Sequence, residues 1–239
     1  MTASQTRQEI ATLVTRLLEE GIAVSGQMPV LRIGGHIGRI TWPSFIVERA
    51  SPLDDLGTIA EYRSLLARRQ FTCVLGDGAL LQLSYEFQRD EILTHRLCFY
   101  PCPIQLVGYE GELDQGLLDV IDGVLEEEFV GSTADPRLRT RSPIRFDFNP
   151  GAANRDHAAS HAHWENADCR LPVFGPLSVG HFVRFVFRRF YPQTWTRYGF
   201  LREWPMHFGN RTLGAPEELE LHFECRQPLL ARIADVIRR

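Results

Sequence analysis

The alternation of apolar and polar residues between residues 71 and 104 is the feature that most constrains the fold. In FTCVLGDGALLQLSYEFQRDEILTHRLCFYPCPI the apolar residues recur at every second position over short runs, which is the period of a half-buried β-strand. Gly76-Asp77-Gly78 and Gln88-Arg89-Asp90 separate these runs with turn-forming residues. Because such short turns join neighbouring antiparallel strands, the stretch predicts an antiparallel meander.

Four further segments have the character of strands. VLRIGGHIGRITW (residues 30–42) contains alternating runs on either side of Gly34-Gly35 and predicts a hairpin. The remaining predicted strands are IRFDF (144–148), AHWENADCRLPV (162–173) and ELELHFEC (218–225).

Helical periodicity is interspersed with these strands. Apolar residues recur at three- and four-residue spacing in residues 4–20, 51–70, 113–129 and 177–191, and a short terminal helix is expected from Gln227. Gly21 is placed to end the first helix, while Ser178 is placed to cap the last long helix and Pro192 to end it. This order of elements predicts an α+β fold, with antiparallel sheet, packed helices and an N-terminal helix.

The charge of the chain changes sign near residue 133. Residues 1–133 hold 10 Arg and 19 acidic residues, a net charge of −9, whereas residues 134–239 hold 16 Arg and 11 acidic residues, a net charge of +5. VGSTADPRLRTRSP (130–143), rich in turn-forming residues, lies at this change and is the best boundary candidate. We therefore expect an acidic N-terminal α+β region and a basic C-terminal one suited to anions, as two parts or as one continuous domain.

Three features bear on the cellular compartment. No apolar run reaches the roughly 18–20 residues that span a bilayer, and MTASQTRQEIATLV lacks the basic and apolar regions of a signal peptide. The five cysteines are odd in number and irregularly spaced, which fits reduced thiols better than a disulfide framework. These features predict a cytoplasmic protein with no membrane partner.

Three of the eight histidines gather in one short segment after the IRFDF strand. They are His157, His161 and His163. In an extended SHAHW segment, His161 and His163 project to the same side, and Arg145 and Asp147 share one side of IRFDF in the same way. If the two strands pair, Asp147, His161 and His163 converge.

Two chemistries suit this convergence. His and carboxylate ligands could hold a divalent metal that activates water or clamps a phosphate. Alternatively, the imidazoles could serve as general base and acid in RNA cleavage, which needs no cofactor. A third interpretation is structural, with His157 and His161 capping turns and His163 pairing with Asp147 in the interior.

Five basic side chains are candidates for binding phosphate. Two adjoin the His segment, and three lie on the polar side of the helix at 177–191, opposite its apolar stripe. They are Arg145, Arg170, His181, Arg184 and Arg188. The N-terminus of this helix follows the His-bearing strand and helix N-termini attract anions, so one phosphate could contact both elements. For the helix, the alternative is a solvated basic face.

Several motifs in a fixed order resemble a known family. They are TIAEYRSLL, GDGALLQLSYEF, HRLCFYPCP, SPIRFDFNP, SHAHW and CRLPVFGPLSVGHFVRFVFRRFY. Over roughly residues 55–195 they resemble the bacterial family called domain of unknown function 2290, whose function is not established. Arg145 and Asp147 on one strand, followed by the paired His161 and His163, are more distantly similar to His-rich toxin ribonucleases. Either resemblance implies a setting of bacterial conflict, as a toxin module or an antiviral defence component.

These features predict a nucleic-acid-directed component of a bacterial toxin or antiviral defence system. We expect a ribonuclease site at His157, His161, His163 and Asp147, with RNA as the favoured nucleic acid and a protein partner encoded alongside. The alternative is a non-catalytic subunit of a defence complex that binds nucleic acid or a protein, in which the His cluster is structural.

Overall fold

The computed structural model describes residues 2–45, 58–103, 119, 141–154, 157–164, 169–207, 209–215 and 222–223. The α-helices are α1 (Ala3–Glu19), α2 (Ile59–Ala67), α4 (Val179–Phe190), α5 (Pro192–Arg197) and α6 (Gly199–Arg202), and η2 (Pro150–Ala152) is a 3-10 turn. The strands are β1 (Ala23–Gly26), β2 (Val30–Gly34), β3 (Ile37–Thr41), β4 (Cys73–Leu75), β5 (Leu80–Gln88), β6 (Glu91–Tyr100), β7 (Ile144–Phe148), β8 (Ser160–Trp164) and β9 (Arg170–Pro172).

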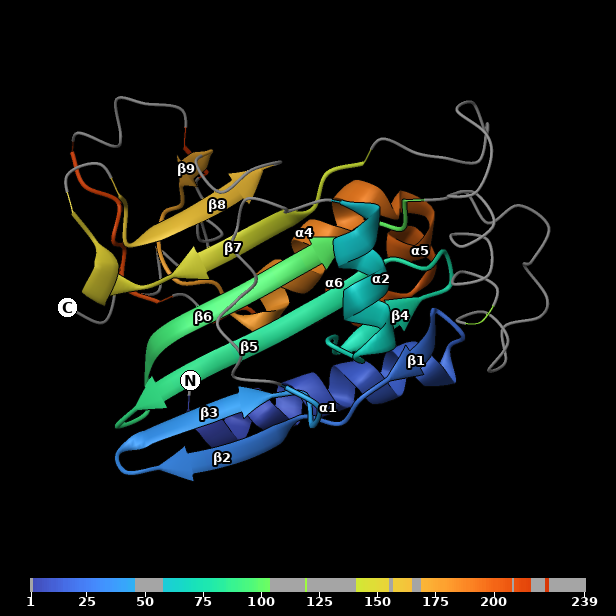
Figure 1. The fold of residues 1–239 in the computed structure, drawn as a ribbon, viewed down its shortest axis with the longest axis horizontal. Helices are drawn as coiled ribbons and strands as arrows, with labels where there is room; N and C mark the ends of the chain where they lie inside the picture. The colour runs from blue at the N-terminus through green and yellow to red at the C-terminus, as the bar shows by residue number, and fades with distance from the viewer. Residues whose placement is uncertain are drawn as a thin grey trace, which may run out of the picture.

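In the described part of the chain, nine strands form one antiparallel sheet (Figure 1). The main order is β1-β4-β5-β6-β7-β8-β9, and β3 pairs with the far end of β5 and with β2. The expected α+β fold with an N-terminal helix is therefore confirmed. The sheet joins strands on both sides of residue 133, because β6 pairs with β7.

The predicted meander and hairpin are both present. β5 and β6 are joined by a two-residue turn of Arg89 and Asp90, both with positive φ (50° and 64°), as a type I′ turn requires. β2 and β3 pair around Gly35, whose φ is 60°. The prediction of one strand over residues 162–173 is wrong in its extent: β8 begins at Ser160, and β9 pairs back onto β8 as a separate antiparallel strand.

One face of the sheet is apolar and is covered by α1 and α4 (Figure 1). The alternation in β5 puts Leu81, Leu83 and Tyr85 on this face, together with the buried residues of α1. Phe146 of β7 packs against two rings of α4, with centroids 6.5 Å from Phe182 and 4.9 Å from Phe185. The apolar stripe of α4 therefore packs on the apolar face of β7.

The predicted helix ends also agree with the structure. Gly21 follows α1 with a positive φ of 64°, and the side chain of Ser178 accepts the backbone N–H of His181 at the start of α4. Pro192 begins α5 immediately after α4.

The opposite face of the sheet carries α2 at one end. Tyr62 and Leu66 of this helix pack on Phe71, Leu80 and neighbouring residues in a second apolar cluster. Beyond α2 this face is polar, over β6, β7 and β8.

Several predicted elements lie outside the described residues. They are the helix at 113–129, apart from the helical Asp119, nearly all of the segment 130–143, the terminal helix from Gln227, and the strand at 218–225 apart from His222 and Phe223. Phe223 makes a parallel bridge with Val173. Over the described residues, none of the helices has the length and apolar character needed to cross a membrane.

Candidate functional site

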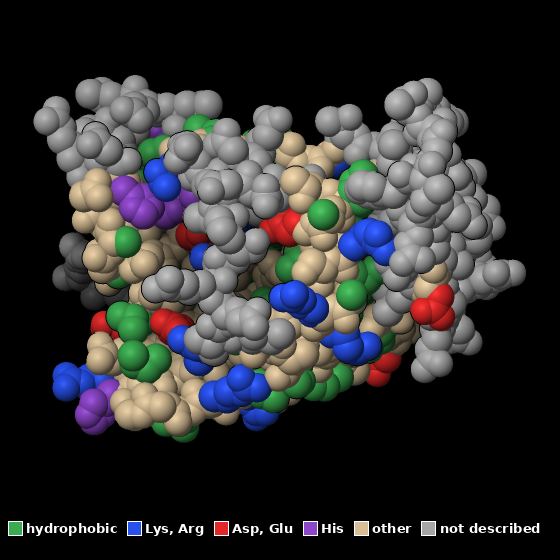
Figure 2. All heavy atoms as spheres, viewed as in Figure 1, with side chains coloured by type: hydrophobic (Ala, Val, Ile, Leu, Met, Phe, Trp, Pro, Cys, Tyr) green, Lys and Arg blue, Asp and Glu red, His purple; other side chains and the backbone are tan. Residues whose placement is uncertain are grey.

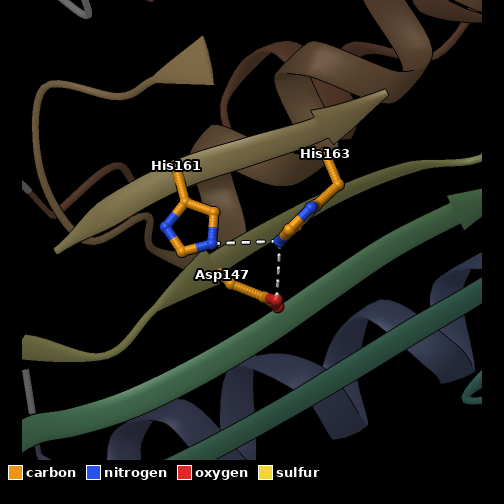
Figure 3. A group of neighbouring side chains, drawn as sticks. All are labelled: Asp147, His161 and His163. Atoms are coloured by element: carbon orange, nitrogen blue, oxygen red, sulfur yellow. Dashed lines mark hydrogen bonds and ion pairs between the residues drawn. The ribbon is translucent and has the colours of Figure 1, made fainter. Parts of the chain in front are cut away.

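A polar cluster lies where β6, β7 and β8 run side by side. The register places Asp147 opposite His161 on one side and Arg96 on the other, while Arg145 lies opposite His163. Residues directly opposite each other in a sheet project to the same face, so these side chains share the polar face. The predicted pairing of the strands and the convergence of Asp147, His161 and His163 are confirmed (Figure 3).

Asp147 is the centre of the charged contacts. Its Oδ2 lies 2.9 Å from Arg145 Nε and 3.4 Å from His163 Nε2, and its Oδ1 lies 3.3 Å from Arg96 Nε. The N–H of Arg145 Nε is not aligned as a hydrogen bond, so this contact is an ion pair. Burial by itself raises the pKa of Asp147, but the hydrogen bond from His163 and the charges of Arg145 and Arg96 outweigh it and hold this pKa well below its usual range.

The three imidazoles form a chain of nitrogen contacts. The Nε2 atom of His161 lies 3.4 Å from Nε2 of His157 and 3.0 Å from Nε2 of His163. The Nδ1 atoms of His157 and His161 contact carbonyl oxygens of the preceding turn, Ala152 at 3.1 Å and Ala158 at 2.8 Å. Burial lowers the pKa of His161 to about 4, so this imidazole is neutral at neutral pH.

The contacts expected of a structural His cluster are also present. His157 and His161 donate to turn carbonyls, and His163 lies beside Asp147 in the interior. His161 and His163 are only 3% and 2% exposed. What a purely structural role does not explain is the approach of Nε2 of His157 to Nε2 of His161, because both rings already donate from Nδ1.

Arg170 lies on the same face of the sheet as the His cluster, whereas the predicted phosphate ligands of α4 do not. Arg170 of β9 is exposed and lies opposite His163 in the register. By contrast α4 packs on Phe146, which projects to the other face of β7 from Asp147. One phosphate therefore cannot contact both the His cluster and the N-terminus of α4.

The basic residues of α4 have other surroundings. His181 is buried and its Nδ1 lies 3.0 Å from the Oγ of the capping Ser178. Arg184 lies over the ring of Trp195, 5.5 Å from its centroid, and Arg188 is exposed.

Arg96 is the site residue that the sequence analysis missed. It lies 51 positions from Asp147, and its place beside that residue depends on the pairing of β6 with β7. The signal was present in the alternation of β6, where Arg96 follows the buried His95 and precedes the buried Leu97. Farther along the same face, Arg39 of β3 forms an ion pair with Glu86 of β5. Figure 2 shows His side chains gathered over β8 and separate Arg side chains elsewhere on this face.

Comparison with known proteins gives one match. A family model described as Uncharacterized conserved protein (DUF2290) matches residues 22–225, most of the chain. No curated protein and no solved structure matches.

Proposed function

This chain belongs to the DUF2290 family of uncharacterised conserved proteins, and we propose that it is a nucleic-acid-directed component of a bacterial toxin or antiviral defence system. In this proposal it cleaves RNA at Asp147, His161 and His163, and acts with a protein partner encoded alongside it. The observation that carries the proposal is the convergence of a carboxylate and imidazole nitrogens beside guanidinium groups on one face of the sheet.

The guanidinium groups supply the positive charge that phosphodiester cleavage needs. Negative charge grows on the phosphate oxygens as the reaction proceeds, and fixed cations stabilise it. Arg96 and Arg145 are already held at Asp147, and Arg170 lies on the neighbouring strand. Because the side chain of Arg96 is 45% exposed, it can turn from Asp147 to an incoming phosphate.

The spacing of the histidines limits how they can act. With 3.0 Å between the Nε2 atoms of His161 and His163, no phosphate fits between them, so they cannot serve as base and acid on opposite sides of a phosphorus atom. Their nitrogens meet at one point instead, which suits the activation of a single attacking water or hydroxyl.

The direct test is cleavage of short single-stranded RNA and DNA by the purified full-length chain. We expect RNA to be cut, and His161→Ala or His163→Ala to lower the rate by about 10²–10⁴-fold, the range of a lost acid–base group. His36→Ala, on the exposed β2–β3 turn, is the matched control and should cleave normally. Cleavage that persists in both cluster variants, or no cleavage of either nucleic acid, contradicts the proposal.

The binding of RNA should depend on residues of the same cluster. Replacing Arg96 and Arg170 together by Glu should weaken RNA binding and reduce its dependence on salt, because fewer counterions are released from the phosphates. Unchanged affinity across a salt titration would place the nucleic acid on another surface.

One observation favours a second candidate. The low exposure of His161 and His163 suits a non-catalytic subunit that binds nucleic acid or a protein partner in a defence complex. In that case the cluster variants lose thermal stability together with binding, and the unaltered chain binds RNA without cutting it.

A further inference from the structure

The His cluster contains two nitrogens that face each other and can only accept. A carbonyl oxygen cannot donate a hydrogen bond, so the contacts with Ala152 and Ala158 place the proton of His157 and of His161 on Nδ1. In the neutral rings both Nε2 atoms then carry lone pairs, and these atoms are 3.4 Å apart. Two lone pairs at this distance repel unless a proton or a metal cation lies between them.

His163 brings a third nitrogen to the same point. Its Nδ1 is buried and has no hydrogen-bond partner in the described part of the chain, so without a metal its proton belongs on Nε2, where His161 and Asp147 can accept it. When a metal ion binds at Nε2, this proton moves to Nδ1 of the neutral ring.

The distances match the donor shell of a tetrahedral metal. Donors about 2.0–2.1 Å from zinc at the tetrahedral angle lie about 3.3–3.4 Å from one another. Among Asp147, His161 and His163 the observed separations are 3.0 Å between Nε2 of His161 and Nε2 of His163, and 3.4 Å between Nε2 of His163 and Asp147 Oδ2. The ligand atoms of Asp147, His161 and His163 all lie within 4.8 Å of one another.

His161 and Asp147 also have the surroundings of metal ligands. Metal-binding imidazoles usually donate their other N–H to a carbonyl or carboxylate, which fixes the ring and its tautomer, and the carbonyls of Ala152 and Ala158 do this here. Ligating carboxylates are likewise held by hydrogen bonds or ion pairs, and Arg96 and Arg145 hold Asp147.

We infer that Nε2 of His161 and His163, with Asp147 Oδ2, form a binding site for a divalent transition-metal ion of the zinc type, with Nε2 of His157 beside it. Imidazole donors select zinc, nickel, copper or iron over magnesium and calcium, which prefer oxygen ligands. Nε2 of His157 lies 3.4 Å from that of His161 and can join the shell only if its ring moves closer to the other two ligands. The site does not depend on RNA being the substrate.

The first test uses the unaltered full-length chain without an affinity tag. Equilibrium dialysis against zinc should give one ion per chain, and magnesium at the same concentration should give none. The cobalt-loaded protein should show the intense visible absorption of a tetrahedral site, and X-ray absorption of the zinc form should show imidazole ligands with N and O donors at about 2.0–2.1 Å. A shell without imidazoles, or no stoichiometric binding, overturns the inference.

The second test uses variants and a matched control. His161→Ala and His163→Ala should each weaken zinc binding by at least about tenfold, and the double variant should abolish it. His36→Ala removes an exposed histidine far from the cluster in the sequence and should leave affinity unchanged. Unchanged affinity in both of these variants means that zinc binds elsewhere. Because no nucleic acid is present, a chain that binds zinc but cuts no RNA contradicts the proposed function alone.

Discussion

Asp147→Asn gives the sharpest test of how the polar cluster is held together. The substitution keeps the shape of the side chain and removes its charge, which leaves the guanidinium of Arg145, only 4% exposed, without a counter-charge. Breaking a buried ion pair by removing one partner typically costs about 3–5 kcal/mol. For a chain of this size that corresponds to a melting temperature lower by about 6–20 °C.

Arg96→Ala is the matched comparison. Arg96 contacts the same carboxylate, but its side chain is 45% exposed. Exposed ion pairs contribute about 0–1 kcal/mol, so we expect a much smaller decrease in melting temperature. A double variant, Arg145→Met with Asp147→Asn, should recover part of the loss, because no buried charge remains unpaired.

The pH dependence follows from the lowered pKa of Asp147. A carboxyl whose pKa is lower in the folded chain stabilises the fold fully above its unfolded pKa of about 3.9, and this contribution is lost as the pH falls toward the folded value. The difference between the unaltered chain and Asp147→Asn should therefore be largest near neutral pH and shrink below about pH 4. The assay is thermal or urea unfolding in the presence of a chelator. Equal destabilisation by Asp147→Asn and Arg96→Ala would refute the reasoning.

Three further predictions concern residues away from this cluster. Ser178→Ala should destabilise the chain by about 1 kcal/mol in urea unfolding through loss of the α4 N-cap, and no change would show that the cap is dispensable. Burial lowers the pKa of His95 to about 4, so between about pH 4 and pH 6.5 the unfolded chain binds more protons than the folded chain. The free energy of unfolding should therefore decrease as the pH is lowered from about 6.5 to about 4, and it should decrease less steeply in His95→Gln. Replacing Arg184 and Arg188 together by Glu should leave RNA binding and its salt dependence almost unchanged, because α4 packs on the face of β7 opposite the His cluster. Weaker binding with a flatter salt dependence would show that the nucleic acid contacts α4.

The sequence by itself determined the local elements and the faces of the strands. Alternation in a strand is a local property, because successive side chains project to opposite faces wherever the strand lies. For that reason Arg145 and Asp147 could be placed together opposite Phe146, and the turns at Gly34-Gly35 and at Arg89 could be located. The Ser178 cap was equally local, because its bond reaches only three residues ahead.

The tertiary structure determined which strands, helices and side chains lie next to one another. Arg96 reaches Asp147 through a pairing of strands far apart in the sequence, and no local pattern fixes such a register. The side of the sheet that α4 covers likewise depends on where Phe146 is buried, and this separates Arg184 from the His cluster. The tautomer of His161 depends on a backbone carbonyl whose direction is set by the turn before β8. The residue type determines which atoms can donate or accept a hydrogen bond, and only the packing determines which of these atoms come into contact.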